Sequence, residues 1–130
     1  PLIAAMAGNV GVQSSAIIVQ GLANNTIIGP IVERLLKELS LGLLNGLILS
    51  IILLLGSYFL LGYEIHIGYT VGIALLSVII MSSLIGTFIP IILNKYGIDP
   101  ALATGPFITT SNDILGILTY FTIAKIVLGI

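Results

Sequence analysis

The chain has 130 residues, of which 58% are hydrophobic and only 7% are charged, and its formal net charge is −1. A soluble domain has about a quarter of its residues charged, so this composition indicates an integral membrane protein and excludes an ordinary soluble domain. The net charge argues against a nucleic-acid partner. The absence of cysteine from the sequence excludes disulfides, zinc–thiolate sites and thiol catalysis.

The first segment, residues 1–23, is apolar but interrupted by polar side chains. On a helix, Asn9, Gln13 and Gln20 fall within roughly 40° of one another and form one polar stripe. Small-residue helix packing accounts for the glycines of this segment, whereas we interpret Asn9 and Gln13 as lining a pore. The segment does not start with Met and has no basic cluster typical of a signal peptide. We therefore expect a fragment that starts inside a membrane segment.

The main charge cluster lies within residues 30–39. Apolar residues recur there at four-residue spacing with charges between them, which predicts a short amphipathic helix at the membrane surface. Two oppositely charged pairs at i,i+4 spacing, Glu33–Lys37 and Arg34–Glu38, are typical of an exposed helix surface. We assign this cluster to structure and topology rather than to chemistry.

Two apolar segments follow, residues 41–62 and 69–93, and each has about the length that crosses a bilayer. The sequence YEIHIGY between them is predicted to be a loop. A lone His66 beside Glu64 in such a loop is more often solvated than a metal ligand.

The last apolar segment, residues 100–128, contains a carboxylate deep within a hydrophobic run. Asp99 is expected to cap its start, and Pro106 to break or tilt it. Asp113 lies near the middle, and an ionisable group inside a membrane faces protein or water rather than lipid. Small oxygen-bearing side chains precede it: Thr109, Thr110, Ser111 and Asn112.

One narrow helical face of this segment, roughly 80° wide, contains Gly105, Thr109, Asp113, Gly116 and Tyr120. We interpret it as part of a cation-permeation site. A polar patch that only joins packed helices is the alternative, but such a patch does not need a formal charge.

Basic residues in short connections favour the cytoplasmic side of a membrane. Arg34 and Lys37 follow the first segment and Lys95 follows the third, whereas the second connection has neither Lys nor Arg. Loops 24–40 and 94–99 are therefore expected in the cytoplasm and the C-terminus outside, in a multi-pass protein of the cell membrane. The predicted fold class is all-α, with about four transmembrane helices plus one short amphipathic interfacial helix.

Two stretches of the chain resemble one known family. GNVGVQSS at residues 8–15 is similar to the Gly-Asn-x-Gly-x-Gln-Ser signature of the MgtE magnesium transporter family. GIDPALATGPFITTSNDILGILTYF at residues 97–121 resembles that family's last membrane helix, with its Thr-Thr-x-x-Asp-x-x-Gly core. The resemblance implies an MgtE-like transmembrane pore domain over 1–130, expected to be incomplete at its N-terminus. The family's first helix and its cytoplasmic amino-terminal and CBS domains have no counterpart in these residues.

The resemblance further implies a homodimeric Mg²⁺ channel whose pore is lined by residues 1–23 and 100–128. On this analogy, Asp113 is the pore carboxylate that holds hydrated Mg²⁺, the transported ion, and Asn9 lines the pore. The other pore-lining candidates are Gln13, Gly105, Thr109, Thr110, Asn112 and Gly116. The expected partners are a second copy, the lipid bilayer and divalent cations.

Two other functions are compatible with the sequence. One is a proton- or sodium-coupled secondary transporter in which Asp113 is the titrating group, and the other is a non-transporting membrane scaffold. Mg²⁺ uptake that persists without a proton or sodium gradient would favour the channel. An enzyme is not expected, because the sequence offers no Ser–His or paired-Asp arrangement for an intramembrane hydrolase.

Overall fold

The structure, a computed structural model, describes residues 2–24, 30–103 and 105–129, without the side chains of Pro30, Ile31, Arg34 and Glu38. These residues form helices and connections, and no strand occurs among them. The elements are α1 (Leu2–Ala23), α2 (Pro30–Phe59), α3 (Ile65–Lys95), the 3₁₀ helix η1 (Pro100–Ala103) and α4 (Pro106–Leu128). The predicted all-α fold is confirmed.

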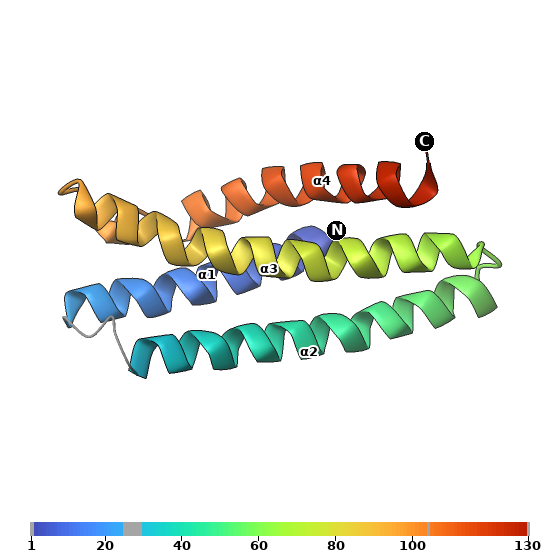
Figure 1. The fold of residues 1–130 in the computed structure, drawn as a ribbon, viewed down its shortest axis with the longest axis horizontal. Helices are drawn as coiled ribbons and strands as arrows, with labels where there is room; N and C mark the ends of the chain where they lie inside the picture. The colour runs from blue at the N-terminus through green and yellow to red at the C-terminus, as the bar shows by residue number, and fades with distance from the viewer. Residues whose placement is uncertain (1, 25–29, 104, 130) are drawn as a thin grey trace.

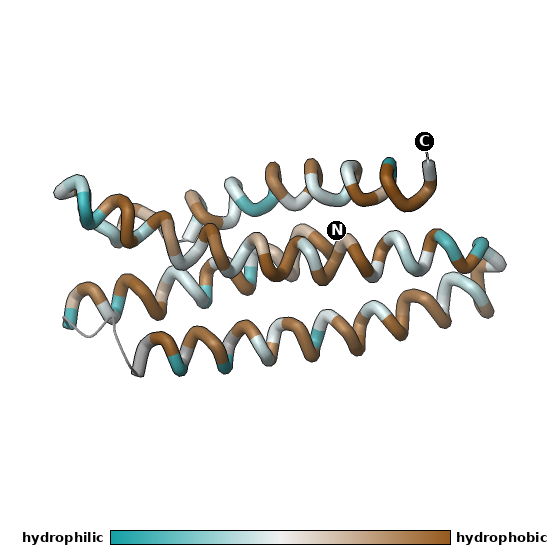
Figure 2. Tube along the Cα trace, viewed as in Figure 1, coloured by the Kyte–Doolittle hydropathy of each residue, from teal (hydrophilic) through white to brown (hydrophobic). Residues whose placement is uncertain are grey.

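The four α-helices of the described residues are each long and apolar enough to cross a membrane. Figure 2 shows hydrophobic residues along most of each helix, interrupted by a few hydrophilic positions. The number of predicted membrane segments is therefore confirmed.

Helix α2 differs from the prediction in its extent. Residues 30–39 are helical, as expected, but they are not a separate short helix, because α2 continues without a break to Phe59. Ser40, at the expected boundary, donates its hydroxyl to the carbonyl of Leu36 at 2.7 Å, so this polar residue is satisfied within the helix. The predicted Glu33–Lys37 ion pair is present at 3.3 Å, with both side chains exposed. The Arg34–Glu38 pair lies outside the described side chains.

The connections that follow α2 and α3 differ in part from the predicted ones. Helix α3 begins at Ile65, so His66 belongs to a helix and the predicted YEIHIGY loop is too long. Gly62 makes the shorter turn possible with a φ of 67°, which glycine adopts without a steric penalty. Asp99 caps η1 by accepting a hydrogen bond at 3.0 Å from the backbone N–H of Ala101. Of the break or tilt predicted near Pro106, the structure shows a break, because η1 and α4 are separate helices.

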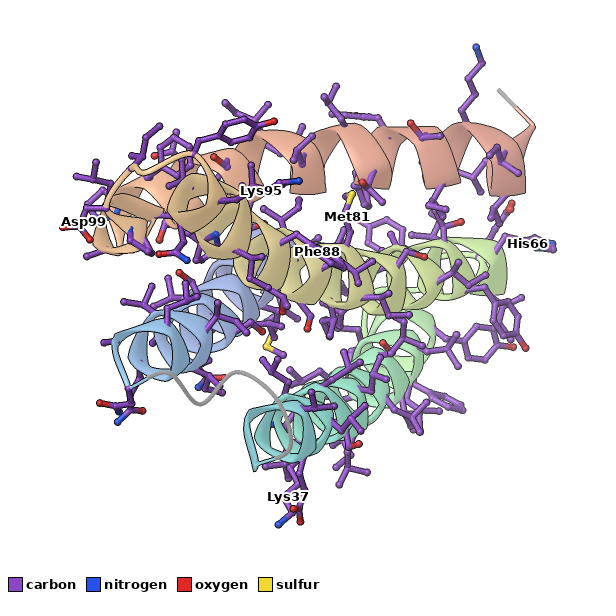
Figure 3. The ribbon with its side chains drawn as sticks, turned by 60° about the vertical axis from the view of Figure 1, so that its left-hand side comes forward. Lys37, His66, Met81, Phe88, Lys95 and Asp99 are labelled. Carbon is purple, nitrogen blue, oxygen red and sulfur yellow. The ribbon has the colours of Figure 1, made fainter. Side chains whose placement is uncertain are left out.

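Successive helices run in opposite directions (Figure 1). The end of α1, the start of α2, the end of α3 and the start of α4 therefore lie at one end of the bundle, shown at the left. Asp99 at this end and His66 at the opposite end are labelled in Figure 3. The basic residues that follow α1 and those that end α3 therefore lie at the same end of the bundle. Helix α3 is central, and it packs against α1, α2 and α4.

Helices α1 and α3 are in close backbone contact. A Cβ atom added to Gly86 would overlap the carbonyl oxygen of Gly11, so the two backbones touch where both residues are glycine. The hydroxyl of Ser82 donates to the carbonyl of Ala7 beside this contact. One turn further along α1, the hydroxyl of Ser14 donates to that of Ser83 at 3.3 Å. Small residues and hydroxyls of this kind hold helices together in lipid.

Gly86→Ala is expected to destabilise the bundle, because the added methyl group meets a backbone atom that cannot rotate away. The overpacking cost is about 1–3 kcal/mol. Gly56→Ala in α2 is the matched control, since a Cβ there meets nothing within 4 Å. Thermal unfolding in detergent, followed by circular dichroism, checks this prediction. Equal midpoints for the two variants would contradict the close contact.

Candidate functional site

An open-sided hollow of about 410 Å³ lies between α1 and α4. Its walls combine small apolar residues with the polar groups of two amides, one hydroxyl and one carboxylate. The lining residues are Ala4, Ala5, Gly8, Asn9, Val12, Gln13, Thr109 and Asp113.

The packing of α1 explains why its amides face this hollow. The buried side of α1 includes Val10, Ser14 and Ile17, and this side packs on the rest of the bundle. Asn9 and Gln13 are one turn apart on another side of the helix and are exposed. Burying the Val10 side therefore turns both amides outward, into the hollow.

The packing of α4 likewise explains why its hydroxyl and its carboxylate lie at the hollow. Its buried residues Ile108, Asn112 and Gly116 recur every four positions, which fixes the side that faces the bundle. Thr109 and Asp113 each follow one of these residues, so they lie about 100° around the helix. Both are half-buried at the edge of the hollow.

The structure brings together four of the residues predicted to line a pore, Asn9, Gln13, Thr109 and Asp113, around one hollow. It does not place the other four there. Asn112 and Gly116 are buried against neighbouring helices, Thr110 is exposed elsewhere on α4, and Gly105 precedes the helix. On the predicted face of α4, Gly116 packs against Val78 and Ala7, whereas Asp113 lies at the hollow.

Four further residues line the hollow that are not among the predicted pore-lining residues: Ala4, Ala5, Gly8 and Val12. Their positions next to, or about one turn from, Asn9 and Gln13 are the signal in the sequence. Ala5 lies four residues before Asn9, and Gly8 and Val12 directly precede the two amides, so they border the same stripe.

Asp113 is the one charged residue among those that line the hollow. Within the described part of the chain, no three His, Cys, Asp or Glu side chains come together as a metal cage. The hollow therefore offers a single carboxylate with neutral amide and hydroxyl groups around it. Such a set can attract a cation and hydrogen-bond its water ligands, but it supplies few oxygens to replace them.

A multi-pass membrane bundle with a polar, carboxylate-bearing hollow is typical of proteins that move ions or solutes. The comparison with known proteins specifies the class. Residues 1–123 match the sequence profile of the MgtE family, described as divalent cation transporters. The chain belongs to this family, whose members are transporters and not enzymes, and the predicted resemblance is confirmed.

Three relatives, each named magnesium transporter MgtE, support this assignment. The protein of Bacillus subtilis is 38% identical over 125 residues, covering 95% of this chain and 28% of the relative. The protein of Enterococcus faecalis is 39% identical over 127 residues, covering 95% of this chain and 27% of the relative. The protein of Thermus thermophilus is 34% identical over 129 residues, covering 98% of this chain and 28% of the relative. The chain thus spans a little over a quarter of the length of these relatives.

The hollow is expected to contain water, and thiol labelling checks this because the sequence has no cysteine of its own. Gln13→Cys should react rapidly with a charged maleimide in membranes. Ile52→Cys, on the apolar side of α2 and 58% exposed, should react slowly because lipid covers it. Ser82→Cys, buried between helices, should also react slowly. Equally slow labelling of Gln13→Cys and Ile52→Cys would contradict a water-filled hollow.

Proposed function

We propose that this chain forms the ion-conducting part of a magnesium transporter and that Mg²⁺ passes through the hollow between α1 and α4 with its water shell. The observation that supports this is the convergence of Asn9, Gln13, Thr109 and Asp113 from two membrane-crossing helices. Desolvating a carboxylate and two amides in a bilayer is costly, so the arrangement requires water or an ion. The names of the relatives specify magnesium.

The charge and size of the hollow favour a hydrated ion over a bare one. Mg²⁺ loses water reluctantly and is usually held by one or two carboxylates with several waters retained. One water needs about 10–15 Å³ of cavity volume, so the hollow of about 410 Å³ is large enough for an ion with its six waters. The Asp113 carboxylate attracts the ion, while the amides of Asn9 and Gln13 and the hydroxyl of Thr109 hydrogen-bond its waters. Such outer-shell binding is weak enough for the ion to leave.

A second copy of the chain completes the pore in this proposal. The hollow is open on one side, and exposed apolar residues such as Ile114 and Ile117 lie near it on α4. A two-fold axis beside the hollow would cover these groups and oppose two Asp113 carboxylates. The resulting pair of charges balances one divalent cation. In this proposal the protein is a homodimer that works as a channel.

The end of the bundle that contains Lys37 and Lys95 is proposed to face the cytoplasm, because basic residues are retained on that side. The C-terminus then lies outside. Lys125, in the last turn of α4, reaches the opposite interface.

Asp113→Asn tests the proposed function, because it removes the charge while preserving the shape of the side chain. We expect Mg²⁺ flux into liposomes to fall to the background rate, with the protein still folded. The matched control is Glu64→Gln, an exposed carboxylate outside the helices, which should conduct like the wild type. Wild-type flux in Asp113→Asn would contradict the proposal.

The same assay separates a channel from a coupled transporter. Flux is repeated with ionophores that collapse proton and sodium gradients. A channel conducts as long as a Mg²⁺ gradient persists. Loss of flux on collapse of either gradient would favour coupled transport instead.

A further inference from the structure

Asn112 is a buried residue whose polar atoms have no partner. Its side chain is 1% exposed, between α4, α1 and α3. Neither the amide nitrogen nor the amide oxygen makes a hydrogen bond within the described part of the chain. Since an unpaired buried amide lowers stability, stability alone favours an apolar residue here.

The amide fills the space above one glycine. A Cβ atom added to Gly11 would overlap Nδ2 of Asn112, and it would lie 2.8 Å from Oγ of Ser82 and 3.0 Å from Cγ2 of Ile108. Gly86 contacts Gly11 from α3. Gly11 is therefore the point at which three helices meet, and the Asn112 amide occupies the space that a side chain at position 11 would take.

Helix α4 packs against both α1 and α3. Its buried residues form one narrow stripe, Ile108, Asn112, Gly116 and Ala124. Gly105 precedes the helix with a φ of 53°, a conformation that glycine adopts freely. Toward the other end, the hydroxyl of Thr119 contacts the sulfur of Met81 at 3.7 Å, and Met81 lies between α3 and α4 in Figure 3.

We propose that Asn112 is a positioning residue for the ion site. Its contact with Gly11 sets the rotation of α4, and Asp113, the next residue, consequently points into the hollow. The inference rests on the proposed function, because it assigns Asn112 an effect on Mg²⁺ binding through Asp113. Asn112 itself does not touch the ion.

The proposal is tested by making residue 112 smaller and residue 11 larger, singly and together. Asn112→Ala empties the space and Gly11→Ala crowds it, so each single variant should raise the Mg²⁺ concentration for half-maximal flux. We expect a change of about tenfold, the scale of coupling between contacting residues. The double variant brings the new methyl group at position 11 into the vacated space, while the Ser82 hydroxyl, 2.8 Å from that Cβ position, still has to shift. Its half-saturating concentration should therefore lie closer to that of the wild type than in either single variant.

Matched controls separate positioning from general loss of structure. Asn45→Ala removes an exposed amide from α2, and Gly56→Ala adds a methyl group where nothing lies within 4 Å. Both should keep the half-saturating concentration of the wild type. Flux is expressed per folded protein, measured by gel filtration after extraction. If Gly11→Ala does not fold, the half-saturating Mg²⁺ concentrations of Asn112→Ala and Asn45→Ala are compared instead, and equal values would overturn the positioning role.

The outcomes distinguish this inference from the proposed function. If wild-type protein conducts, Asp113→Asn does not, and Asn112→Ala keeps the wild-type half-saturating concentration, the positioning role is overturned while the proposed function stands. A double variant worse than both single variants also overturns it. If Asp113→Asn conducts like the wild type, both proposals fail.

Discussion

The contact between the backbones of α1 and α3 at Gly11 and Gly86 is the constraint on which the rest of the structure depends. In lipid there is no hydrophobic driving force between apolar helices, so they associate through close packing and polar contacts. Glycine at both positions lets the backbones touch, and the hydroxyls of Ser82 and Ser14 join the helices on either side. A larger residue at position 86 would meet the backbone of Gly11, separate the helices and weaken both contacts.

This contact also determines which side chains remain unpaired. Once one side of α1 packs against α3, the amides of Asn9 and Gln13 must point away from the bundle. Helix α4 packs in turn on Gly11 through Asn112, which directs Asp113 toward the same space. The polar hollow is therefore a consequence of where the small residues lie. The same glycines that stabilise the bundle leave a carboxylate and two amides at the hollow, without a hydrogen-bond partner among the residues that the structure describes.

Much of this arrangement can be predicted from the sequence because membrane helices obey strong local rules. Hydrophobic length alone locates the four spans, since every backbone group must be hydrogen-bonded inside the bilayer. Helical periodicity places Asn9 with Gln13 and Thr109 with Asp113, and the structure brings the two pairs together around one hollow.

The remaining features depend on contacts between helices, which periodicity does not contain. The 30–39 segment is amphipathic, but nothing at Ser40 interrupts it, so it continues into α2. In the sequence, Asn112 is one of the polar residues clustered next to Asp113. In the structure, its side chain is instead buried against Gly11. A polar residue in a membrane helix can face water or a neighbouring helix, and the partner helix decides which. The sequence of one helix alone cannot distinguish the two.

The central claim is that the hollow holds a cation together with its water shell. The most direct test measures binding of hexaamminecobalt(III), an octahedral cation whose six ligands do not exchange, to the purified protein by calorimetry. Because an outer-shell site contacts only those ligands, the account predicts that this ion binds, that it competes with Mg²⁺, and that Asp113→Asn abolishes its binding. Binding of Mg²⁺ without any binding of hexaamminecobalt(III) would contradict the account, since the site would then require direct contact with a dehydrated ion.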